Sequence, residues 1–422
     1  MTRPRRDFLR QVTGVALASA SWSASAGTAY ATGYAQAQSD DERYWGVLRH
    51  QFSLEEGLTY LNAANICPAS RPVLDRQVEY IRDFHRDPSF QNRDKYKPMY
   101  ERLRGKLAGV LHAASPDEIA ILRNTSEGNN LIVNGLKFSE GDEIIITDHN
   151  HQSNNEAWKW RSKRDGLVVK SVQVKVPGQS SAALIGECER LISPRTKMIA
   201  VTHVTATTGL LFPVRQIAEL ARRRNVWLHV DGAQTFGVLD VDVQALGCDS
   251  YTASAHKWMM GPLETGVLFV RSERISELWP PIITAGWTED LVGARRLDVV
   301  GQREDPRVVA FEAAVDFMQA IGVGRVEARS MALTAHAKRL LAEIPAVQMK
   351  SAMEPEMSGA LVKFSLRNRS TKDAYDTLWQ KHRIALAMTP AGDSEGLRCA
   401  PHIYNTFDDI ERLVSGVREL AG

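Results

Sequence analysis

The sequence predicts an α/β protein in which a mostly parallel β-sheet carries helices on both faces and is followed by a smaller α+β domain. As far as about residue 303, short apolar runs alternate with stretches of helical periodicity, and this alternation is typical of a parallel sheet. Beyond that point, long helical stretches are followed by a few strands. The chain has 422 residues, of which 44% are hydrophobic, and this is enough apolar material for a large core.

The first part of the chain supplies the elements of the predicted parallel sheet. A short strand over 58–62 precedes helices over 73–84 and 100–111, where apolar residues recur at helical spacing. Short apolar or β-branched runs then predict strands at 143–147, 167–174, 198–204, 226–231, 250–255 and 266–270. The helices between them are expected at 157–163, 182–192 and 214–224.

The second part of the chain predicts the smaller domain. Helices are expected at 307–321, 326–341 and 408–420, and strands at 360–366, 384–388 and 398–401. The resulting division has four parts. We expect an N-terminal leader over 1–31, an N-terminal segment over 40–65, a large domain over 66–303 and a small domain over 304–422.

Composition excludes several classes of protein. Lys and Arg total 52 and Asp and Glu total 50, so the near-neutral charge argues against a protein built mainly to bind nucleic acid. The four cysteines are widely spaced and form no CxxC pair, which indicates neither a zinc ribbon nor a disulfide framework. No apolar run in the body of the chain approaches the ~20 residues that a membrane-spanning helix needs.

The first 31 residues have the pattern of an export signal. Arg5 and Arg6 precede a weakly apolar stretch over 12–26, and small residues end in Ala29-Tyr30-Ala31. This order resembles a twin-arginine signal, although Pro4 stands where Ser or Thr is usual. A second A-x-A pattern at 35–37 leaves two cleavage positions open. The resemblance implies a periplasmic protein that the twin-arginine translocase exports in a folded state, as a protein that folds around a cofactor would require.

The two side chains best suited to catalysis or cofactor binding stand at the ends of predicted strands. Asp231 ends the apolar run WLHVD, and Lys257 follows another strand 26 residues later, within SAHKW. Ligands in α/β sheets bind at the carboxyl ends of strands. An apolar neighbourhood lowers the pKa of a lysine, and Trp258 and Met259 make full solvation of Lys257 unlikely, so this lysine suits Schiff-base chemistry. Taken alone, Asp231 could equally be a turn cap and Lys257 a surface residue.

The motifs VDGAQ and SAHKW together resemble the class V aminotransferase family of pyridoxal-phosphate enzymes, and within it the isopenicillin N epimerase-like branch. The resemblance runs from about residue 60 to the C-terminus. It implies fold type I, pyridoxal 5'-phosphate as cofactor, a small amino-acid or peptide-like substrate and a homodimer. It also implies that Lys257 carries the cofactor and shuttles protons, and that Asp231 keeps the pyridine nitrogen protonated.

The same resemblance assigns the cofactor's phosphate to the start of a helix. The segment RNTSEGNN over 123–130 ends a strand and opens a helix, and free N–H groups at a helix start bind anions. The family's phosphate contacts correspond here to Thr125 and Ser126. Ser254 and His256 would complete the phosphate-binding site. An ordinary helix cap is the alternative interpretation of this segment.

The resemblance also implies roles for residues around the cofactor's ring. His151 takes the place of the aromatic ring that stacks on the pyridine. The alternative is a periplasmic metal-binding protein that uses Asp148, His149, His151 and His203. Ala206 replaces an asparagine that contacts the cofactor's phenolic oxygen in desulfurases of the family, which leaves Gln234 as the main partner of that oxygen.

The substrate side of the site is implied by two segments. In RCAPHIYNT, Arg398 corresponds to the clamp for the substrate carboxylate, and Asn62 lies in the N-terminal loop that lines the pocket. The loop 389–395 lacks the cysteine nucleophile of the desulfurases. Gln302 replaces a threonine that contacts the partner subunit's phosphate, so the resemblance leaves this contact open.

The residues leave the reaction open among transamination, epimerisation, elimination and decarboxylation. Transamination needs a keto acid to regenerate the cofactor, and the periplasm is no obvious source of keto acids. Among exported members of the family, the chain resembles enzymes that mature the siderophore pyoverdine by acting on a chromophore-linked glutamate. This resemblance implies a role in siderophore tailoring.

The leader generates the first prediction. Replacing Arg5 and Arg6 by lysine should retain the protein in the cytoplasm, folded and carrying its cofactor, because the twin-arginine route depends on the arginine pair. Fractionation of cells that express each version, followed by immunoblotting, measures the distribution. Equal periplasmic amounts of the wild type and the double mutant would show that the signal is of another type.

Overall fold

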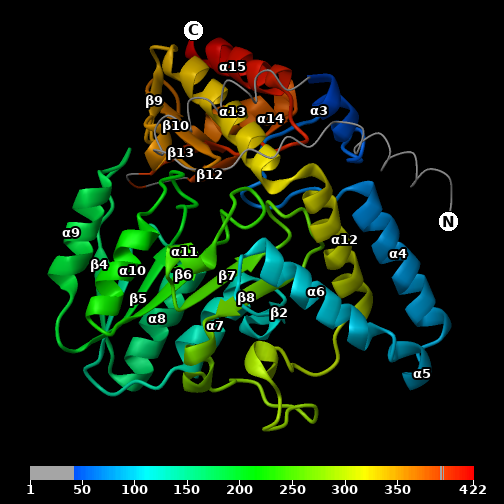
Figure 1. The fold of residues 1–422 in the computed structure, drawn as a ribbon. Helices are drawn as coiled ribbons and strands as arrows, with labels where there is room; N and C mark the ends of the chain where they lie inside the picture. Colours follow the sequence, from blue (N-terminus) through cyan, green and yellow to red (C-terminus); the bar gives the residue numbers. More distant parts are fainter. Residues whose placement is uncertain (1–41, 390–391, 393) are drawn as a thin grey trace, which may run out of the picture.

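The computed structural model describes residues 42–389, 392 and 394–422. The expected leader over 1–31 therefore lies outside the described residues. Figure 1 shows a large lower region built on one sheet and a smaller upper region that contains the C-terminus. Among the described residues, no helix is both long enough and apolar enough to cross a membrane.

The lower region is built on a seven-stranded sheet with the order β2-β8-β7-β6-β5-β3-β4. Five neighbouring strands, from β7 to β4, pair in parallel, and only β8 runs antiparallel to its neighbours. The strands are β2 (Ile119–Leu122), β3 (Glu143–Thr147), β4 (Val168–Val172), β5 (Thr196–Thr202), β6 (Trp227–Asp231), β7 (Ser250–Ser254) and β8 (Gly266–Val270). The α/β class with a mostly parallel sheet is thus confirmed.

Helices cover both faces of this sheet because its strands are apolar on both sides. Ile145 packs into one core cluster, whereas its neighbours Ile144 and Ile146 pack into another, as the two-residue period of a strand requires. The first cluster contains side chains of α6 (Tyr96–Val110), α9 (Ser181–Leu191) and α10 (Val214–Arg223), and the second contains side chains of α7 (Thr125–Gly135) and α8 (Gln152–Asp165). The short helix α11 (Val243–Leu246) follows β6.

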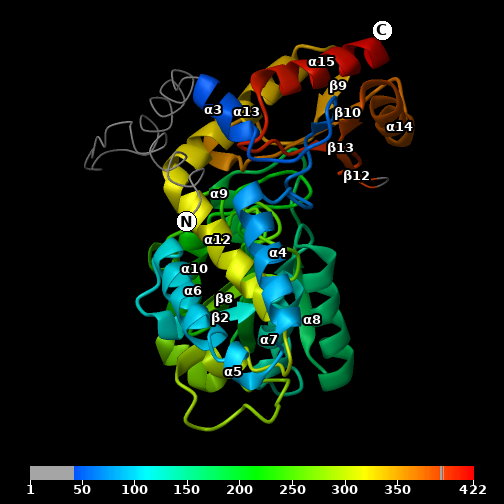
Figure 2. The ribbon, with the colours of Figure 1, turned by 90° about the vertical axis from the view of Figure 1, so that its right-hand side faces the viewer.

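The upper region is an antiparallel sheet of four strands with three helices (Figure 2). Its order is β12-β13-β10-β9. The strands are β9 (Val347–Met349), β10 (Val362–Leu366), β12 (Ala387–Thr389) and β13 (Gly396–Cys399), and the helices are α13 (Val323–Ala342), α14 (Thr371–His382) and α15 (Phe407–Ala421). Leu333, Leu378 and Leu413, one from each helix, share a core with Phe364 and Leu397 of the sheet.

The N-terminal segment joins the two regions. The helix α3 (Glu42–Arg49) is followed by β1 (Thr59–Tyr60), which pairs in parallel with β11 (Ile384–Ala385) near the C-terminus. The helix α4 (Arg71–Arg86) then descends beside α12 (Asp305–Ile321), as both views show (Figures 1 and 2). Short helices complete the described chain: α5 (Phe90–Arg93), η1 (Pro116–Glu118), η2 (Ser272–Glu277), η3 (Gly293–Leu297) and η4 (Pro355–Met357).

Several predicted elements need correction. The expected strand over 384–388 is two strands in two sheets, because Ile384–Ala385 pairs with β1 whereas Ala387–Thr389 pairs with β13. The strand expected at 398–401 lies at Gly396–Cys399. The helix α14 was not predicted, since it buries only Thr371, Ala374 and Leu378 and its apolar period is weak. The short elements α3, α5 and β9 were also missed.

Candidate active site

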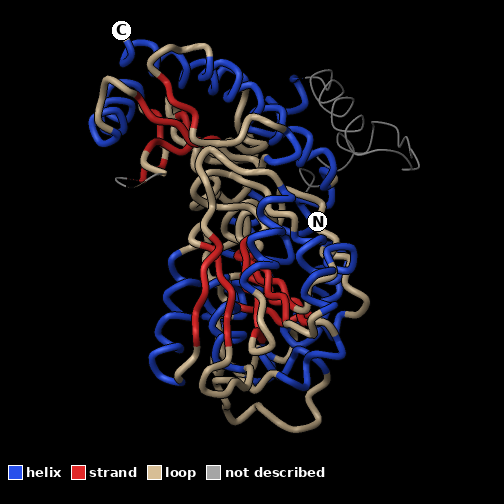
Figure 3. Tube along the Cα trace, turned by 90° about the vertical axis from the view of Figure 1, so that its left-hand side faces the viewer, coloured by secondary structure: helices blue, strands red, loops and turns tan. Residues whose placement is uncertain are grey.

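The site lies where the carboxyl ends of the parallel strands face the smaller region. Figure 3 shows loops gathered between the strands of the two sheets. Asp231 is the last residue of β6, and Lys257 lies three residues beyond the end of β7, the neighbouring strand. Parallel strands bring their carboxyl ends to one edge, which is why two residues 26 positions apart share one site.

Lys257 has an environment that favours its neutral amine. Trp258 and Met259 are buried beside it, whereas Lys257 itself is partly exposed. Burial lowers the pKa of Lys257 to about 8, with Asp231 raising it and Arg398 lowering it. A lysine with this pKa has a substantial fraction of nucleophilic amine near neutral pH.

Asp231 is a buried carboxylate with two protein donors. Its side chain is 2% exposed. Its Oδ1 accepts a hydrogen bond from the backbone N–H of Ala233 at 3.1 Å, and its Oδ2 accepts one from Nδ2 of Asn129 at 3.1 Å. Each carboxylate oxygen has room for a second donor, so Asp231 can still accept an N–H from a ligand.

The start of α7 provides the expected anion-binding loop. The side chain of Asn124 caps the helix by accepting from the N–H of Glu127 at 2.9 Å. Thr125 is tied to Ser254, since its N–H and its hydroxyl lie 2.8 and 2.7 Å from Ser254 Oγ. Ser126 is exposed at the same turn. The structure therefore brings Thr125, Ser126 and Ser254 together, as predicted from the sequence.

His256 lies two residues beyond Ser254, at the carboxyl end of β7. Its Nδ1 is buried and has no hydrogen-bond partner among the residues that the structure describes. Burial and the nearby Lys257 lower the pKa of His256 to about 4, so its ring is neutral at physiological pH. A buried ring nitrogen without a protein partner is available to a ligand, and a phosphate oxygen could fill this place.

His151 stands at the first turn of α8, on the exposed side of the site. Its Nδ1 accepts from the N–H of Ser153 at 3.3 Å, which directs Nε2 away from the helix. Burial lowers the pKa of His151, and the charges of Lys257, Asp231 and Arg398 all act on it. The ring therefore lies within electrostatic range of the three groups that it was expected to join.

The metal alternative lacks a suitable cluster. Within 42–389, 392 and 394–422, no three His, Cys, Asp or Glu side chains are grouped so that they could hold a metal ion. Asp148 accepts from the N–H of Val174, and His149 Nδ1 lies 3.3 Å from the hydroxyl of Thr207. His203 is buried, and burial lowers its pKa to about 4.

Arg398 enters the site from β13 of the smaller region. Its Nη1 donates to the carbonyl of Ala206 at 2.8 Å, and its Nη2 donates to Oδ1 of Asn62 at 3.2 Å. Its Nε is buried and has no partner in the described part of the chain. Asn62 is brought there by an isolated β-bridge to Ala400, two residues beyond Arg398. The guanidinium is fixed by two contacts and keeps N–H groups for a carboxylate.

Two glutamines that were singled out in the sequence have contacts within the chain. Gln234 is buried, with Oε1 accepting from the indole of Trp258 at 2.8 Å and Nε2 donating to the carbonyl of Ala64 at 2.9 Å. The second N–H of Gln234 remains available to a ligand, so its contact with the cofactor's phenolic oxygen stays a prediction. The side chain of Gln302 accepts from Arg93 of the same chain at 2.7 Å.

Sequence reasoning missed three residues close to the site. Lys363 lies directly opposite Arg398 in the β10–β13 register, and its Nζ donates to Thr389 and to the carbonyl of Gly396. Asn129 and His229 stand within the quoted motifs but were given no role. No signal in the sequence marks these residues, because their roles depend on strand register and on how closely α7 approaches the sheet.

The residues at this edge fit pyridoxal phosphate. A lysine with a lowered pKa, a buried carboxylate and an anion-binding helix start lie around one site, and His256 and Arg398 keep buried polar atoms without protein partners. These residues provide a lysine to which the cofactor can attach, a carboxylate that can accept from a ring N–H, and a binding site for the phosphate.

Comparisons with known proteins agree with this geometry. The model of the family "Aminotransferase class-V" matches residues 59–413. An isopenicillin N epimerase from Amycolatopsis lactamdurans is 31% identical over 394 residues, which cover 89% of this chain and 98% of the relative. An apo cysteine desulfurase from Thermococcus onnurineus NA1 superposes with a TM-score of 0.80 at 25% identity, covering 88% of this chain and 97% of the other.

A solved structure of C-DES, with glycine covalently linked to its pyridoxal-phosphate cofactor, has the same fold. Its TM-score is 0.80 at 22% identity, and it covers 88% of this chain and 99% of its own. Since the family model spans most of the sequence and the epimerase matches nearly end to end, the chain belongs to the class V aminotransferase family and is a pyridoxal-phosphate-dependent enzyme of fold type I.

Proposed function

We propose that this enzyme acts in the periplasm on an amino-acid-derived metabolite and tailors the glutamate moiety of a pyoverdine-type siderophore. The observation that carries the proposal is the leader over 1–31, with its arginine pair and A-x-A end, in front of a cofactor-binding fold. A twin-arginine route suits such a protein because it transports chains that have already folded. The carboxylate clamp at Arg398 suits an amino-acid moiety.

The alternative is epimerisation, elimination or decarboxylation of a free amino acid. The similarity to an isopenicillin N epimerase over nearly the whole chain supports it. None of these reactions needs a second substrate to restore the cofactor, whereas transamination needs a keto acid. We therefore place transamination behind the other reactions for an exported enzyme.

Each residue of the proposed site has its own role in the reaction. Pyridoxal phosphate supplies an electron-accepting ring when bound. Lys257 would hold the cofactor and would move a proton at the substrate carbon, a task for which its lowered pKa of about 8 is suited. Asp231 would hold a proton at the ring nitrogen, His151 would pack against the ring, and Arg398 would fix the substrate carboxylate.

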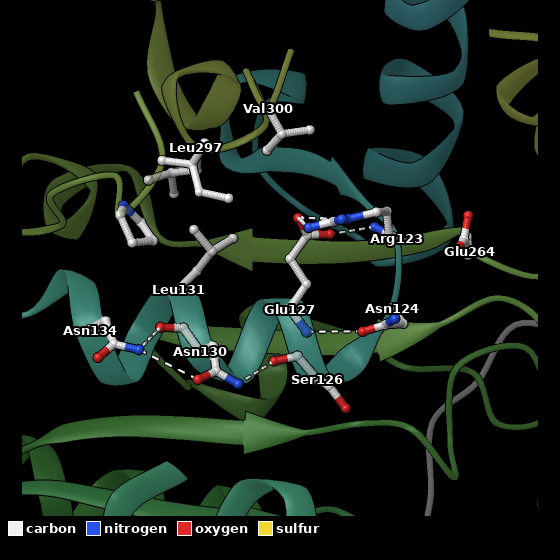
Figure 4. A pocket seen from close by; sticks show the side chains of 12 residues that line it. Arg123, Asn124, Ser126, Glu127, Asn130, Leu131, Asn134, Glu264, Leu297 and Val300 are labelled. Atoms are coloured by element: carbon white, nitrogen blue, oxygen red, sulfur yellow. Dashed lines mark hydrogen bonds and ion pairs between the residues drawn. The ribbon is translucent and has the colours of Figure 1, made fainter. Parts of the chain in front are cut away.

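We also propose that the enzyme is a homodimer. A pocket of about 460 Å³ lies beside α7, and Ser126, one of the expected phosphate contacts, is part of its lining (Figure 4). The segment across the pocket contains the exposed apolar side chains Trp279, Ile282 and Ile283. Contiguous exposed apolar residues mark interaction sites. A second copy of the protein that docks here would lie next to the expected phosphate-binding residues.

Metabolite profiling tests the proposed substrate. We expect a strain that lacks the gene to accumulate the siderophore with an unmodified glutamate moiety, and expression of the intact gene to restore the wild-type product. A version with Lys257→Ala is the matched control, since it should be exported without restoring the product. An unchanged siderophore profile in the deletion strain would contradict the proposed substrate and leave the alternative on free amino acids.

Lys257→Ala should reduce turnover by at least about 10²-fold, because general acid–base catalysis alone contributes about 10²–10⁴-fold. Mass spectrometry after borohydride reduction should find the cofactor on Lys257. Lys363 is the relevant comparison, since burial and Arg398 lower its pKa to about 7. An adduct on Lys363, or on any other lysine, would refute the assignment of Lys257.

The four cysteines should be dispensable. The loop 389–395 has no cysteine, and Cys67, Cys188, Cys248 and Cys399 are all buried. Burial raises the pKa of each thiol, so the thiolate that a desulfurase needs is disfavoured at every position.

Single Cys→Ser variants should therefore retain the native activity within a few-fold, and the wild type should release no sulfide from free cysteine. Sulfide release and persulfide labelling during turnover provide the measurements. A persulfide on any of the four residues would place the enzyme with the desulfurases.

A further inference from the structure

A continuous chain of side-chain hydrogen bonds runs behind Asp231. The indole Nε1 of Trp227 donates to Ser250 Oγ at 2.9 Å, and Ser250 Oγ lies 2.8 Å from Nδ1 of His229. Nε2 of His229 lies 2.8 Å from Oδ1 of Asn129, whose Nδ2 donates to Asp231 Oδ2 at 3.1 Å. All five side chains are buried, none being more than 3% exposed.

The side chains of this hydrogen-bonded network come from three neighbouring elements of the fold. Trp227, His229 and Asp231 alternate along β6 and so point to the same face of the sheet. Ser250 is the β7 partner of His229 in the strand register. Asn129 comes from α7, which packs on that face.

The approach of α7 depends on the glycine that precedes Asn129. A Cβ on Gly128 would lie 1.9 Å from Oγ1 of Thr252 on β7, a distance that no side chain tolerates. Only glycine therefore allows the helix to come near enough for Asn129 to bridge His229 and Asp231.

The directions of these hydrogen bonds are fixed from both ends, because an indole N–H can only donate and a carboxylate can only accept. An indole N–H can only donate, so Ser250 Oγ accepts it and directs its own proton to Nδ1 of His229. His229 then carries its proton on Nε2 and donates to Oδ1 of Asn129. This orients the amide with Nδ2 toward Asp231, since the flipped amide would set Oδ1 against the carboxylate and Nδ2 against the His229 N–H.

His229 remains neutral in this arrangement. Burial lowers the pKa of His229 to about 3, and among the described residues the ring nitrogens contact only Ser250 and Asn129. A protonated ring would place a second N–H against Ser250 Oγ, which already accepts from Trp227 and would then have no partner for its own proton.

We infer that Asn129 and His229 are positioning residues for Asp231, which hold its carboxylate with one oriented N–H and leave its other lone pairs directed at the cofactor's ring nitrogen. Ser250, which accepts from Trp227, donates to Nδ1 of His229 and so matches this tautomer. The inference rests on the role of Asp231 in holding the cofactor and does not depend on the substrate or the compartment.

The first measurement is the ring tautomer in the apoenzyme. Selective ¹⁵N-histidine labelling of the full chain, with His229→Gln used to assign the signal, should show protonated Nε2 and unprotonated Nδ1 at His229. Trp227→Phe leaves Asn129 and Asp231 in place and should therefore keep the proton on Nε2. A protonated Nδ1 with unprotonated Nε2, in the wild type or in Trp227→Phe, would overturn the directed network.

The second measurement is the affinity of the apoenzyme for pyridoxal phosphate, obtained by equilibrium dialysis. Asn129→Ala removes a hydrogen bond to a charged group and should weaken binding about 10- to 100-fold. His229→Leu should weaken it similarly, whereas His229→Gln, which can still donate at the ε position, should recover most of the affinity. Asn368→Ala is the control, since this exposed asparagine donates only to the carbonyl of Ala421 and should bind as the wild type does.

Wild-type affinity in a folded Asn129→Ala variant would refute the positioning role, as would a His229→Gln variant no better than His229→Leu. If Asn129→Ala does not fold, the tautomer of His229 in the wild type and in Trp227→Phe decides the question. No substrate enters either measurement, so their failure is distinguishable from failure of the siderophore proposal.

Discussion

The buried carboxylate of Asp231 is the group around which the site is built. Taking a charged carboxylate out of water is unfavourable unless hydrogen bonds and nearby positive charge compensate it. Asp231 has one backbone donor and one side-chain donor, and it acts electrostatically on Lys257 and His151. The strand end fixes its position, and Asn129 fixes its orientation, so the carboxylate stays where a ring N–H can meet it.

The second constraint is the connection between the two regions. The strand β1 pairs with β11, and Asn62 forms a bridge with Ala400, so the N-terminal segment is tied into the C-terminal part of the fold. This places Asn62 beside Arg398, while the carbonyl of Ala206, in the turn that follows β5, accepts from the same guanidinium. Arg398 is therefore held by both regions at once, and the distance from the carboxylate clamp to Lys257 depends on how the regions pack.

Much of the fold could be predicted because buried parallel strands are short apolar runs. The strands at 143–147 and 266–270 were predicted with the bounds that the structure has, and the proximity of Asp231 and Lys257 follows from strand ends meeting at one edge. Lys363 could not be predicted, since its place opposite Arg398 depends on antiparallel register in the small sheet. Asn129 and His229 could not be assigned either, because their contact requires the approach of α7 that Gly128 permits.

The surroundings of the lysine explain how one fold supports different reactions. The relatives of this chain include an isopenicillin N epimerase and a cysteine desulfurase, so similar chains carry out different reactions. Here the thiols are buried and their pKa values are raised, whereas burial lowers the pKa of Lys257 to about 8. The residues around Arg398 therefore favour proton transfer by a lysine over attack by a protein thiolate.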